Sequence, residues 1–281
     1  MIDALVTGAQ GFIGQPLCAR LVAVGQSVLP LGRAAGDVTD WSTWQSLPPA
    51  KVVYHLAGRS YVPDSWTDTA AFVRTNVVGT EQALAYCRKH GARMVLASAY
   101  VYGIPARMPI READPVKPNN PYAMTKYLAE QLCAFAAEYH GVTATALRIF
   151  NVFGAGQREA FLIPRLLSQL AVGDQIRLLD LAPRRDYVFL DDVVESFVAA
   201  GTIEEGSRVL NIGSGKSHSV QEIVDIIQSL AGTTLPVISA ATERPQEIPD
   251  VVADISNAKA ILDWYPRWTF RDGIAKLLTG S

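Results

Sequence analysis

A glycine-rich stretch near the amino terminus constrains the fold of this chain more than any other feature. It reads TGAQGFIG over residues 7–14 and lies between an apolar strand and a helical pattern. Gly8 suits a tight turn, Gly11 lets the backbone approach a pyrophosphate, and Gly14 lets the helix pack closely on the strand. Three glycines could serve the turn alone, and the spacing is GxxGxxG rather than GxGxxG. Their place between a first strand and a first helix nevertheless predicts a dinucleotide site.

The residues after this turn and after the second strand indicate which dinucleotide fits. Phe12 and Ile13 lie where the helix begins, and the N–H groups and positive dipole end of a helix favour phosphates. NAD-binding units usually place an acid at the end of the second strand, to bind the ribose hydroxyls. This chain has Arg33 there, which suits a 2′-phosphate, although it could be a surface arginine. Asp37 and Val38 are candidate adenine contacts, and the pattern favours NADP over NAD.

A tyrosine and a lysine four residues apart begin a predicted helix in the middle of the chain. Asn120 suits its N-cap and Pro121 its first residue, so Tyr122 and Lys126 share one face of its first turns. We expect the ammonium and the positive helix end to lower the pKa of the tyrosine toward the working range of an acid or base. Ser98, at the end of the preceding strand, could hydrogen-bond the reacting oxygen. These three residues are the predicted catalytic group.

Strands alternate with helices through the first half of the chain, which predicts an α/β fold. The expected arrangement is a Rossmann-type doubly wound parallel sheet with a smaller C-terminal substrate-binding lobe. The breaker-rich segment 151–157 suggests that residues 1–157 form the dinucleotide-binding domain and 158–281 mainly the lobe, while segments of 183–225 could return to the first domain. The expected strands are 2–7, 27–31, 51–56, 94–97 and 143–150, and the expected helices are 14–24, 70–90 and 121–139.

Composition excludes several classes of function. The chain has 25 Lys+Arg against 27 Asp+Glu, a net charge of -2 that argues against a nucleic-acid or membrane-surface partner. Three separated cysteines suggest buried thiols in a reducing compartment, and the four histidines lack metal spacing. We find no targeting segment and no run of about 20 apolar residues, the length that spans a bilayer. The expected location is cytoplasmic.

These motifs together resemble the extended short-chain dehydrogenase/reductases that modify nucleotide sugars, namely 4-epimerases, 4,6-dehydratases and 4-ketoreductases. The resemblance covers nearly the whole chain. The motifs are TGAQGFIG (7–14), HLAG (55–58), NVVGT (76–80), SAYVYG (98–103), PYAMTK (121–126), FNVFGAGQ (150–157), RDYVFLDDV (185–193), NIGSG (211–215) and RPQEI (244–248).

The resemblance implies further site residues and an assembly. It places Leu56, Ala57 and Gly58 near the adenosine side of the coenzyme, and Asn76 at a strand-to-helix turn near the coenzyme. It implies that Asn151 contacts the phosphate region of the substrate, and that Arg185 and Arg244 clamp the nucleotide diphosphate. For Arg185 the alternative is an ion pair with Asp186 or Asp191. The helices at 70–90 and 121–139 resemble those that pair in a four-helix dimer contact, so a homodimer is expected.

Departures from the family patterns narrow the reaction. The 4,6-dehydratases carry Asp-Glu after the serine or threonine, where this chain has Ala99 and Tyr100, so dehydration is not expected. The arginine in place of an acid after the second strand departs from NAD-bound epimerases. The resemblance therefore favours reduction of a 4-keto-6-deoxy nucleotide sugar by NADPH. A 4-epimerase is the second interpretation, and a non-catalytic cofactor-binding regulator is a distant third.

Overall fold

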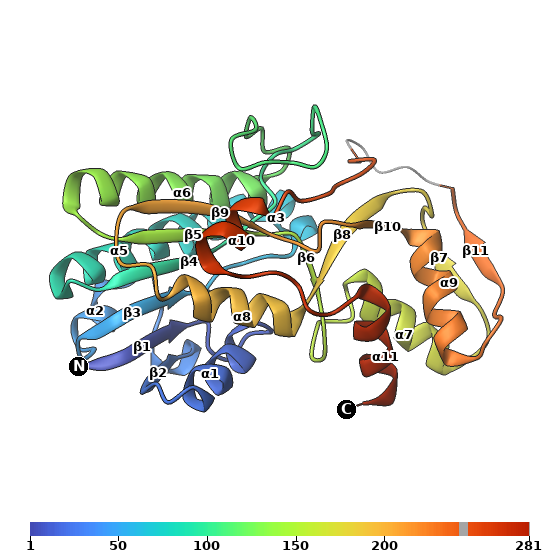
Figure 1. Cartoon of the computed structure of the whole chain (residues 1–281), viewed down its shortest axis with the longest axis horizontal. Coiled ribbons are helices and arrows are strands. Elements are labelled where there is room, and N and C mark those ends of the chain that lie inside the picture. Colours follow the sequence, from blue (N-terminus) through green and yellow to red (C-terminus); the bar gives the residue numbers. More distant parts are fainter. Residues whose placement is uncertain (242–246, 281) are drawn as a thin grey trace.

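Six parallel strands form the central sheet of the computed structural model, which describes residues 1–241 and 247–280 (Figure 1). Their order across the sheet is β2-β1-β3-β4-β5-β9. The strands are β1 (Ile2–Thr7), β2 (Val28–Leu31), β3 (Ala50–His55), β4 (Arg93–Ala99), β5 (Ala144–Ile149) and β9 (Ser207–Ile212). The chain runs from β1 to one edge at β2, returns to β3 beside β1, and continues toward the other edge. Ligands of such sheets bind beyond the carboxyl ends of the strands at this reversal.

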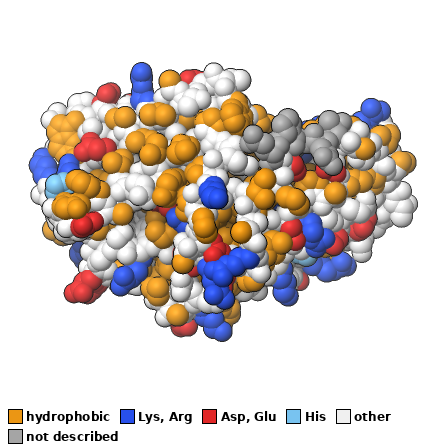
Figure 2. Space-filling view, turned by 90° about the horizontal axis from the view of Figure 1, so that it is seen from above, with side chains coloured by type: hydrophobic (Ala, Val, Ile, Leu, Met, Phe, Trp, Pro, Cys, Tyr) orange, Lys and Arg blue, Asp and Glu red, His pale blue; other side chains and the backbone are white. Residues whose placement is uncertain are grey.

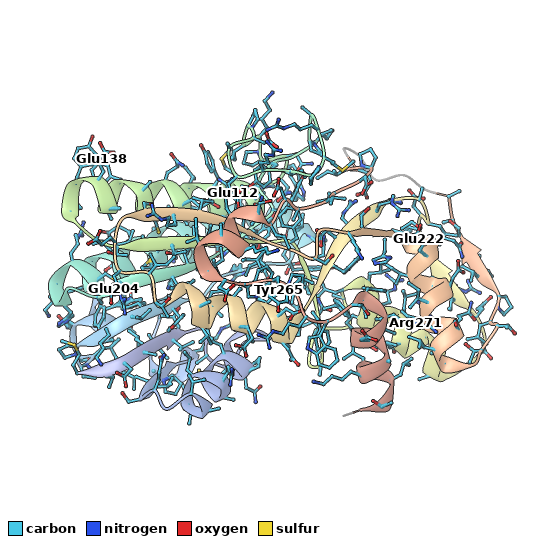
Figure 3. The ribbon with its side chains drawn as sticks, viewed as in Figure 1. Glu112, Glu138, Glu204, Glu222, Tyr265 and Arg271 are labelled. Atoms are coloured by element: carbon cyan, nitrogen blue, oxygen red, sulfur yellow. The ribbon has the colours of Figure 1, made fainter. Side chains whose placement is uncertain are left out.

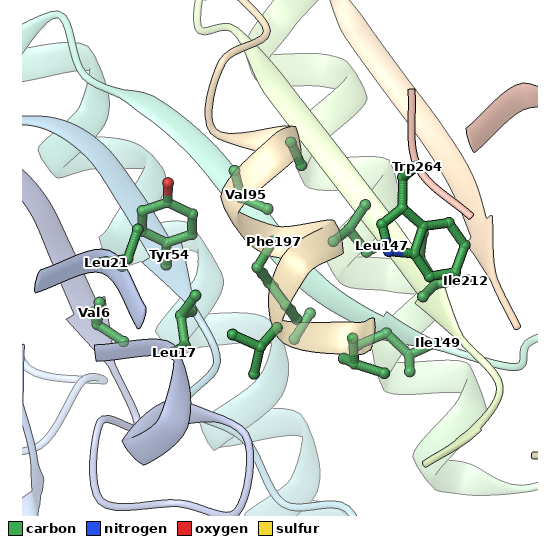
Figure 4. Close-up of a cluster of buried hydrophobic side chains, with 14 of the residues drawn as sticks. Val6, Leu17, Leu21, Tyr54, Val95, Leu147, Ile149, Phe197, Ile212 and Trp264 are labelled. Carbon is green, nitrogen blue, oxygen red and sulfur yellow. The ribbon is translucent and has the colours of Figure 1, made fainter. Parts of the chain in front are cut away.

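Helices cover both faces of the sheet, as expected for apolar strands buried on two sides. On one face lie α1 (Gly14–Ala23), α8 (Leu190–Ala200) and α10 (Ser256–Leu262), and on the other α2 (Trp41–Gln45), α5 (Gly79–His90) and α6 (Pro121–His140). Figure 4 shows the first core, in which Leu17, Phe197 and Trp264 pack on strand residues such as Val6 and Leu147. The Rossmann-type doubly wound sheet predicted from the sequence is confirmed.

The helix expected at 70–90 is built from three consecutive segments. They are α4 (Thr69–Val73), a π-helical turn (Arg74–Val78) and α5, preceded by the short helix α3 (Val62–Thr67). Asn76 lies inside the π-helical turn. The expectation that it occupies a strand-to-helix turn is therefore wrong, because helix continues on both sides of it. A π-helical turn inserts one extra residue and shifts the side-chain register of the helix after it.

A smaller body at the right of Figure 1 has its own sheets and core. Antiparallel β10 (Ser217–Ser219) and parallel β6 (Asn151–Phe153) flank β8 (Arg184–Phe189), and β11 (Val237–Ser239) pairs with β7 (Ile176–Leu178). Its helices are α7 (Leu162–Val172), α9 (Val220–Ala231) and α11 (Phe270–Thr279). Residues 151–157, which were expected to be irregular, therefore contain strand β6. Strand β9 and helix α8 pack with the first half of the chain, while the boundary at residue 157 stays a prediction.

Three further findings bear on function. No helix among residues 1–241 and 247–280 is long and apolar enough to cross a bilayer. Cys87 and Cys133 are buried free thiols and Cys18 is a half-buried one. The described residues contain no group of His, Cys, Asp and Glu side chains that could hold a metal ion.

Candidate active site

The glycine turn after β1 is packed too tightly for any side chain at two positions. Gly8 has a positive φ of 67°, and a Cβ there would lie 2.8 Å from the backbone nitrogen of Ala57. A Cβ at Gly14 would lie 2.1 Å from the carbonyl oxygen of Gly8, closer than any real contact. The backbone of Gly11 donates to the same carbonyl at 2.9 Å. The turn therefore brings backbone without side chains to the carboxyl end of β1, where the strand order of the sheet reverses.

The start of α1 keeps N–H groups free beside this turn. Among the described residues, the backbone N–H groups of Phe12 and Ile13 donate to no acceptor, and Ile13 caps the helix without a side-chain hydrogen bond. Uncapped N–H groups at a helix start, next to glycine backbone, form a phosphate-binding arrangement. This cradle fits the pyrophosphate of a dinucleotide.

The loop after β3 is fastened to the glycine turn by buried hydrogen bonds. The Thr7 hydroxyl accepts from the backbone of Ala57 at 3.1 Å and lies 2.9 Å from Nδ1 of His55. Burial lowers the pKa of His55 to about 3, so the imidazole is neutral and shapes the loop without carrying charge. Leu56, Ala57 and Gly58 thus border the turn, where the resemblance places the coenzyme.

Asn76 joins this loop to the helix that carries the predicted catalytic pair. Its Oδ1 accepts from the backbone of Arg59 at 2.8 Å, and its Nδ2 donates to the Arg59 carbonyl at 3.1 Å and to Oγ1 of Thr125 at 2.9 Å. A Cβ at Gly58 would lie 3.0 Å from Nζ of Lys126 and 3.1 Å from Oδ1 of Asn76. The amide therefore holds the loop after β3 against α6, close to Lys126.

The catalytic helix begins as the sequence predicts. Oδ1 of Asn120 accepts from the backbone of Ala123 at 2.9 Å, and Pro121 is the first residue of α6. The half-buried Tyr122 ring packs edge-on against Phe72, with centroids 6.3 Å apart. Its hydroxyl makes no hydrogen bond within the described part of the chain.

The expectation that Lys126 and the helix start lower the pKa of Tyr122 is wrong. Burial raises the pKa of Tyr122 above its usual value, and Lys126 does not offset this effect. The ammonium of Lys126 instead donates to the carbonyl of Ala97 at 2.9 Å. Removal from water therefore outweighs the cation one helical turn away, and the phenol is held in its protonated form.

Burial makes the charged form of Lys126 energetically unfavourable. Lys126 is 6% exposed, and burial lowers its pKa from 10.5 to about 8, while Glu130 acts in the opposite direction. Below pH 8 the folded protein must bury an ammonium. As the pH rises from about 8 toward 10.5 the folded state has released a proton that the unfolded chain keeps, so stability rises.

We therefore expect Lys126→Met to stabilise the coenzyme-free protein. At pH 7 the free energy of unfolding should increase by about 2 kcal/mol, and its rise between pH 8 and 10 should largely disappear. Urea unfolding at several pH values measures both effects. Lys259→Met, at an exposed site on α10, serves as the control and should change neither. A destabilised Lys126→Met protein at pH 7 would show that the ammonium is favourably placed.

Ser98 lies in a buried polar network that the sequence analysis did not predict. Its hydroxyl donates to Oε1 of Glu130 at 2.5 Å, and Glu130 pairs with Arg148 at 2.7 Å. Nη1 of Arg148 donates to the Tyr102 hydroxyl at 2.9 Å and to the carbonyl of Glu112, which Figure 3 labels. The spacing of four between Tyr122, Lys126 and Glu130 was the signal in the sequence that could have identified Glu130.

The residues assigned to the adenosine end lie at the surface beyond β2. Arg33 is exposed in a 3₁₀ turn (Arg33–Ala35) and forms no ion pair with any described residue. Asp37 accepts from the backbone of Thr39 at 2.9 Å, which shapes the next turn. A Cβ at Gly79 would lie 3.1 Å from the Val38 side chain, so this turn packs against α5. The guanidinium of Arg33 is available to a phosphate.

Of the residues expected to bind the substrate phosphates, the described part of the chain contains Arg185 and Asn151. Arg185 on β8 donates to the carbonyl of Ile248 at 2.6 Å and pairs with Glu247. The alternative partners were Asp186 and Asp191, and the guanidinium pairs with neither. Nδ2 of Asn151 on β6 donates to the carbonyl of Asp186 at 3.4 Å, which places Asn151 beside β8. Arg244 lies outside the described residues.

Asp186 organises the backbone around these residues. Its buried carboxylate accepts from the backbone of Ser214 at 2.6 Å, Gly215 at 2.9 Å and Ala253 at 3.0 Å. Burial raises the pKa of Asp186, and these hydrogen bonds oppose the rise. The glycine loop of residues 213–215 therefore binds an internal carboxylate.

Comparisons with known proteins agree with this geometry. Residues 4–213 match the model of the NAD dependent epimerase/dehydratase family. A GDP-6-deoxy-D-mannose reductase of Pseudomonas aeruginosa is 29% identical over 98% of this chain and 95% of its own length. A UDP-glucose 4-epimerase of Mycolicibacterium smegmatis is 31% identical over 97% of this chain and 96% of its own length.

Solved structures are likewise similar to this chain over nearly its whole length. RMD from Pseudomonas aeruginosa, complexed with NADPH, superposes with a TM-score of 0.91 at 27% identity, covering 99% of this chain and 98% of the other. MoeE5, in complex with UDP-glucuronic acid and NAD, gives a TM-score of 0.90 at 32% identity, covering 97% and 96%. In both, the likeness extends over both bodies of the fold.

Proposed function

The chain belongs to the NAD-dependent epimerase/dehydratase family, and on that premise we propose that it reduces the C4 carbonyl of a 4-keto-6-deoxy nucleotide sugar with NADPH. The family and the relatives support a broader assignment: the chain is an NAD(P)-dependent enzyme of the group that contains sugar-nucleotide epimerases, reductases and dehydratases. The specific reaction is supported by the exposed Arg33 after β2, because an arginine there suits the 2′-phosphate of NADP, and an exchangeable NADPH suits net reduction. The relative named GDP-6-deoxy-D-mannose reductase supports this choice.

The coenzyme would occupy the edge of the sheet where β1 and β3 end. Arg33 favours NADP over NAD, because a guanidinium there can bind the 2′-phosphate. The neighbour solved with NADPH supports the same preference, although other neighbours are solved with NAD. The residues proposed to hold it are Gly8, Gly11, Phe12, Ile13, Gly14, Arg33, Asp37, Val38, Leu56, Ala57, Gly58, Asn76, Tyr122 and Lys126.

The proposed roles of the side chains follow from their positions. When bound, the reduced coenzyme supplies a hydride to C4 of the sugar. Tyr122 donates its phenol proton to the C4 oxygen, and Ser98 hydrogen-bonds the C4 hydroxyl that results. We propose that Lys126, which lies beside Gly58 and the Ala97 carbonyl, binds ribose hydroxyls. Arg185 would bind the diphosphate after leaving Glu247, and we propose Asn151 and Arg244 as further substrate contacts.

Incubation with a GDP-4-keto-6-deoxyhexose tests the reaction. NADPH should be consumed in stoichiometric amounts, and NADH should be used with a lower kcat/KM. The decrease in nicotinamide absorbance measures both. The second candidate, a 4-epimerase, is favoured by the Mycolicibacterium relative at 31% identity. It would be supported if UDP-glucose and its C4 epimer interconverted without added coenzyme, and that result would overturn the reductase proposal.

We propose a homodimer through an apolar stripe on α6. Met124, Leu128, Phe135 and Tyr139 are exposed by 44%, 40%, 52% and 63% and recur at helical spacing. Figure 2 looks onto this side and shows hydrophobic side chains over the half that carries α6. Leu128→Glu should convert a dimer to a monomer in light scattering, whereas Val172→Glu, 73% exposed on α7, should not. A monomeric wild-type protein would contradict the proposal.

A further inference from the structure

A buried ion pair controls the hydroxyl of Ser98. Glu130 and Arg148 are 3% and 4% exposed, and the guanidinium reaches both carboxylate oxygens, with Nε 3.0 Å from Oε1 and Nη2 2.7 Å from Oε2. Ser98 and Arg148 are register partners on neighbouring strands β4 and β5. The serine and the ion pair therefore lie side by side, and packing leaves little freedom to separate them.

The direction of the Ser98 hydrogen bond follows from the chemistry of its partners. An arginine has only donors, and a carboxylate paired with it has only acceptors. The 2.5 Å contact between Ser98 Oγ and Glu130 Oε1 must therefore use the single hydrogen of the hydroxyl. Toward a ligand, Ser98 can therefore act only as a hydrogen-bond acceptor, through a lone pair on its oxygen.

We propose that Glu130 is a positioning residue that takes the hydrogen of Ser98 and makes the serine a hydrogen-bond acceptor toward the substrate. The inference rests on the proposed function and deepens it. An acceptor at Ser98 binds a C4 hydroxyl, which has a hydrogen to donate, better than a C4 carbonyl, which has none. The proton for the carbonyl then comes from Tyr122 alone. This assigns Ser98 to the alcohol form of the sugar and Tyr122 to the keto form.

Glu130→Gln tests this because an amide can reverse the hydrogen bond. With its oxygen on Arg148, the introduced glutamine would present its NH₂ group to Ser98, which frees the serine hydrogen for the ligand. Calorimetry measures the dissociation constants of a GDP-6-deoxyhexose with NADPH and of its 4-keto form with NADP⁺, two pairs that cannot react. The variant should shift the ratio of the two constants by about tenfold toward the keto sugar.

A matched control and a turnover measurement separate positioning from folding. Glu138→Gln makes the same change at an exposed site on the same helix, labelled in Figure 3, and should leave the ratio unchanged. In Glu130→Gln, kcat should change while the KM for NADPH stays close to the wild-type value. Loss of stability with an unchanged ratio would make Glu130 purely structural and overturn the inference.

Ser98→Ala keeps the inference testable if Glu130→Gln does not fold. It should weaken binding of the hydroxyl sugar and leave binding of the keto sugar nearly unchanged, because the serine offers the carbonyl no hydrogen. Weaker binding of the keto sugar instead would show that Ser98 is a donor and would overturn the inference. If the wild-type protein bound neither sugar, the proposed function would fail, and the inference with it.

Discussion

Tyr122→Phe should lower kcat by about a thousandfold while coenzyme binding is retained. The substitution removes only the hydroxyl, and general acid catalysis contributes a factor of about 10² to 10⁴. The ring would still pack edge-on against Phe72, so the fold and the glycine turn should be unaffected. Initial rates with a GDP-4-keto-6-deoxyhexose measure kcat, and fluorescence titration of NADPH measures binding.

The control for this experiment is Tyr265→Phe, which removes a hydroxyl at a 50% exposed site after α10. It should leave kcat unchanged. If Tyr122→Phe kept most of its turnover, the phenol would not be the proton donor. If it kept the biological activity of the protein without turnover, the chain would act as a cofactor-binding regulator.

Gly14→Ala should weaken coenzyme binding by about a hundredfold. A Cβ there would lie 2.1 Å from the Gly8 carbonyl and 2.9 Å from Cα of Ala9, and both contacts are backbone. The turn would have to move by about an ångström, which is enough to cost about 10²-fold in a positioned site. Overpacking should also lower the free energy of unfolding by roughly 3 kcal/mol. NADPH titration and urea unfolding measure the two effects.

Gly91→Ala distinguishes crowding from backbone strain. Gly91 ends α5 with a φ of 64°, but a Cβ there meets no atom within 4 Å. Alanine should cost only about 1 kcal/mol in stability for the left-handed conformation and leave NADPH affinity intact. Equal losses of affinity in the two variants would mean that the close approach at Gly14 is not what the coenzyme requires.

Local patterns were sufficient for much of the fold. The glycine turn, the Asn120-Pro121 helix start and the alternation of apolar strands with helices each depend on residues close together in sequence. The structure has β1, α1 and α6 within about one residue of the predicted bounds. The short strands β6 and β10 were missed, because three residues carry no period and pair only across the smaller body.

Contacts between distant residues decided the chemistry of the site. Ser98 and Glu130 are 32 residues apart, and Asn76 and Thr125 are 49 apart, so no local pattern connects them. The same holds for Arg185, whose partner Glu247 lies 62 residues away rather than next to it.

The sequence by itself determined the sheet, the place of the glycine turn and the identity of the candidate catalytic side chains. Only the tertiary structure decided their protonation and hydrogen-bond direction. Charge and spacing along a helix predicted a lowered pKa for Tyr122, whereas burial raises it. The physical reason is that desolvation depends on everything that surrounds a group, and that surrounding is assembled only when the chain folds.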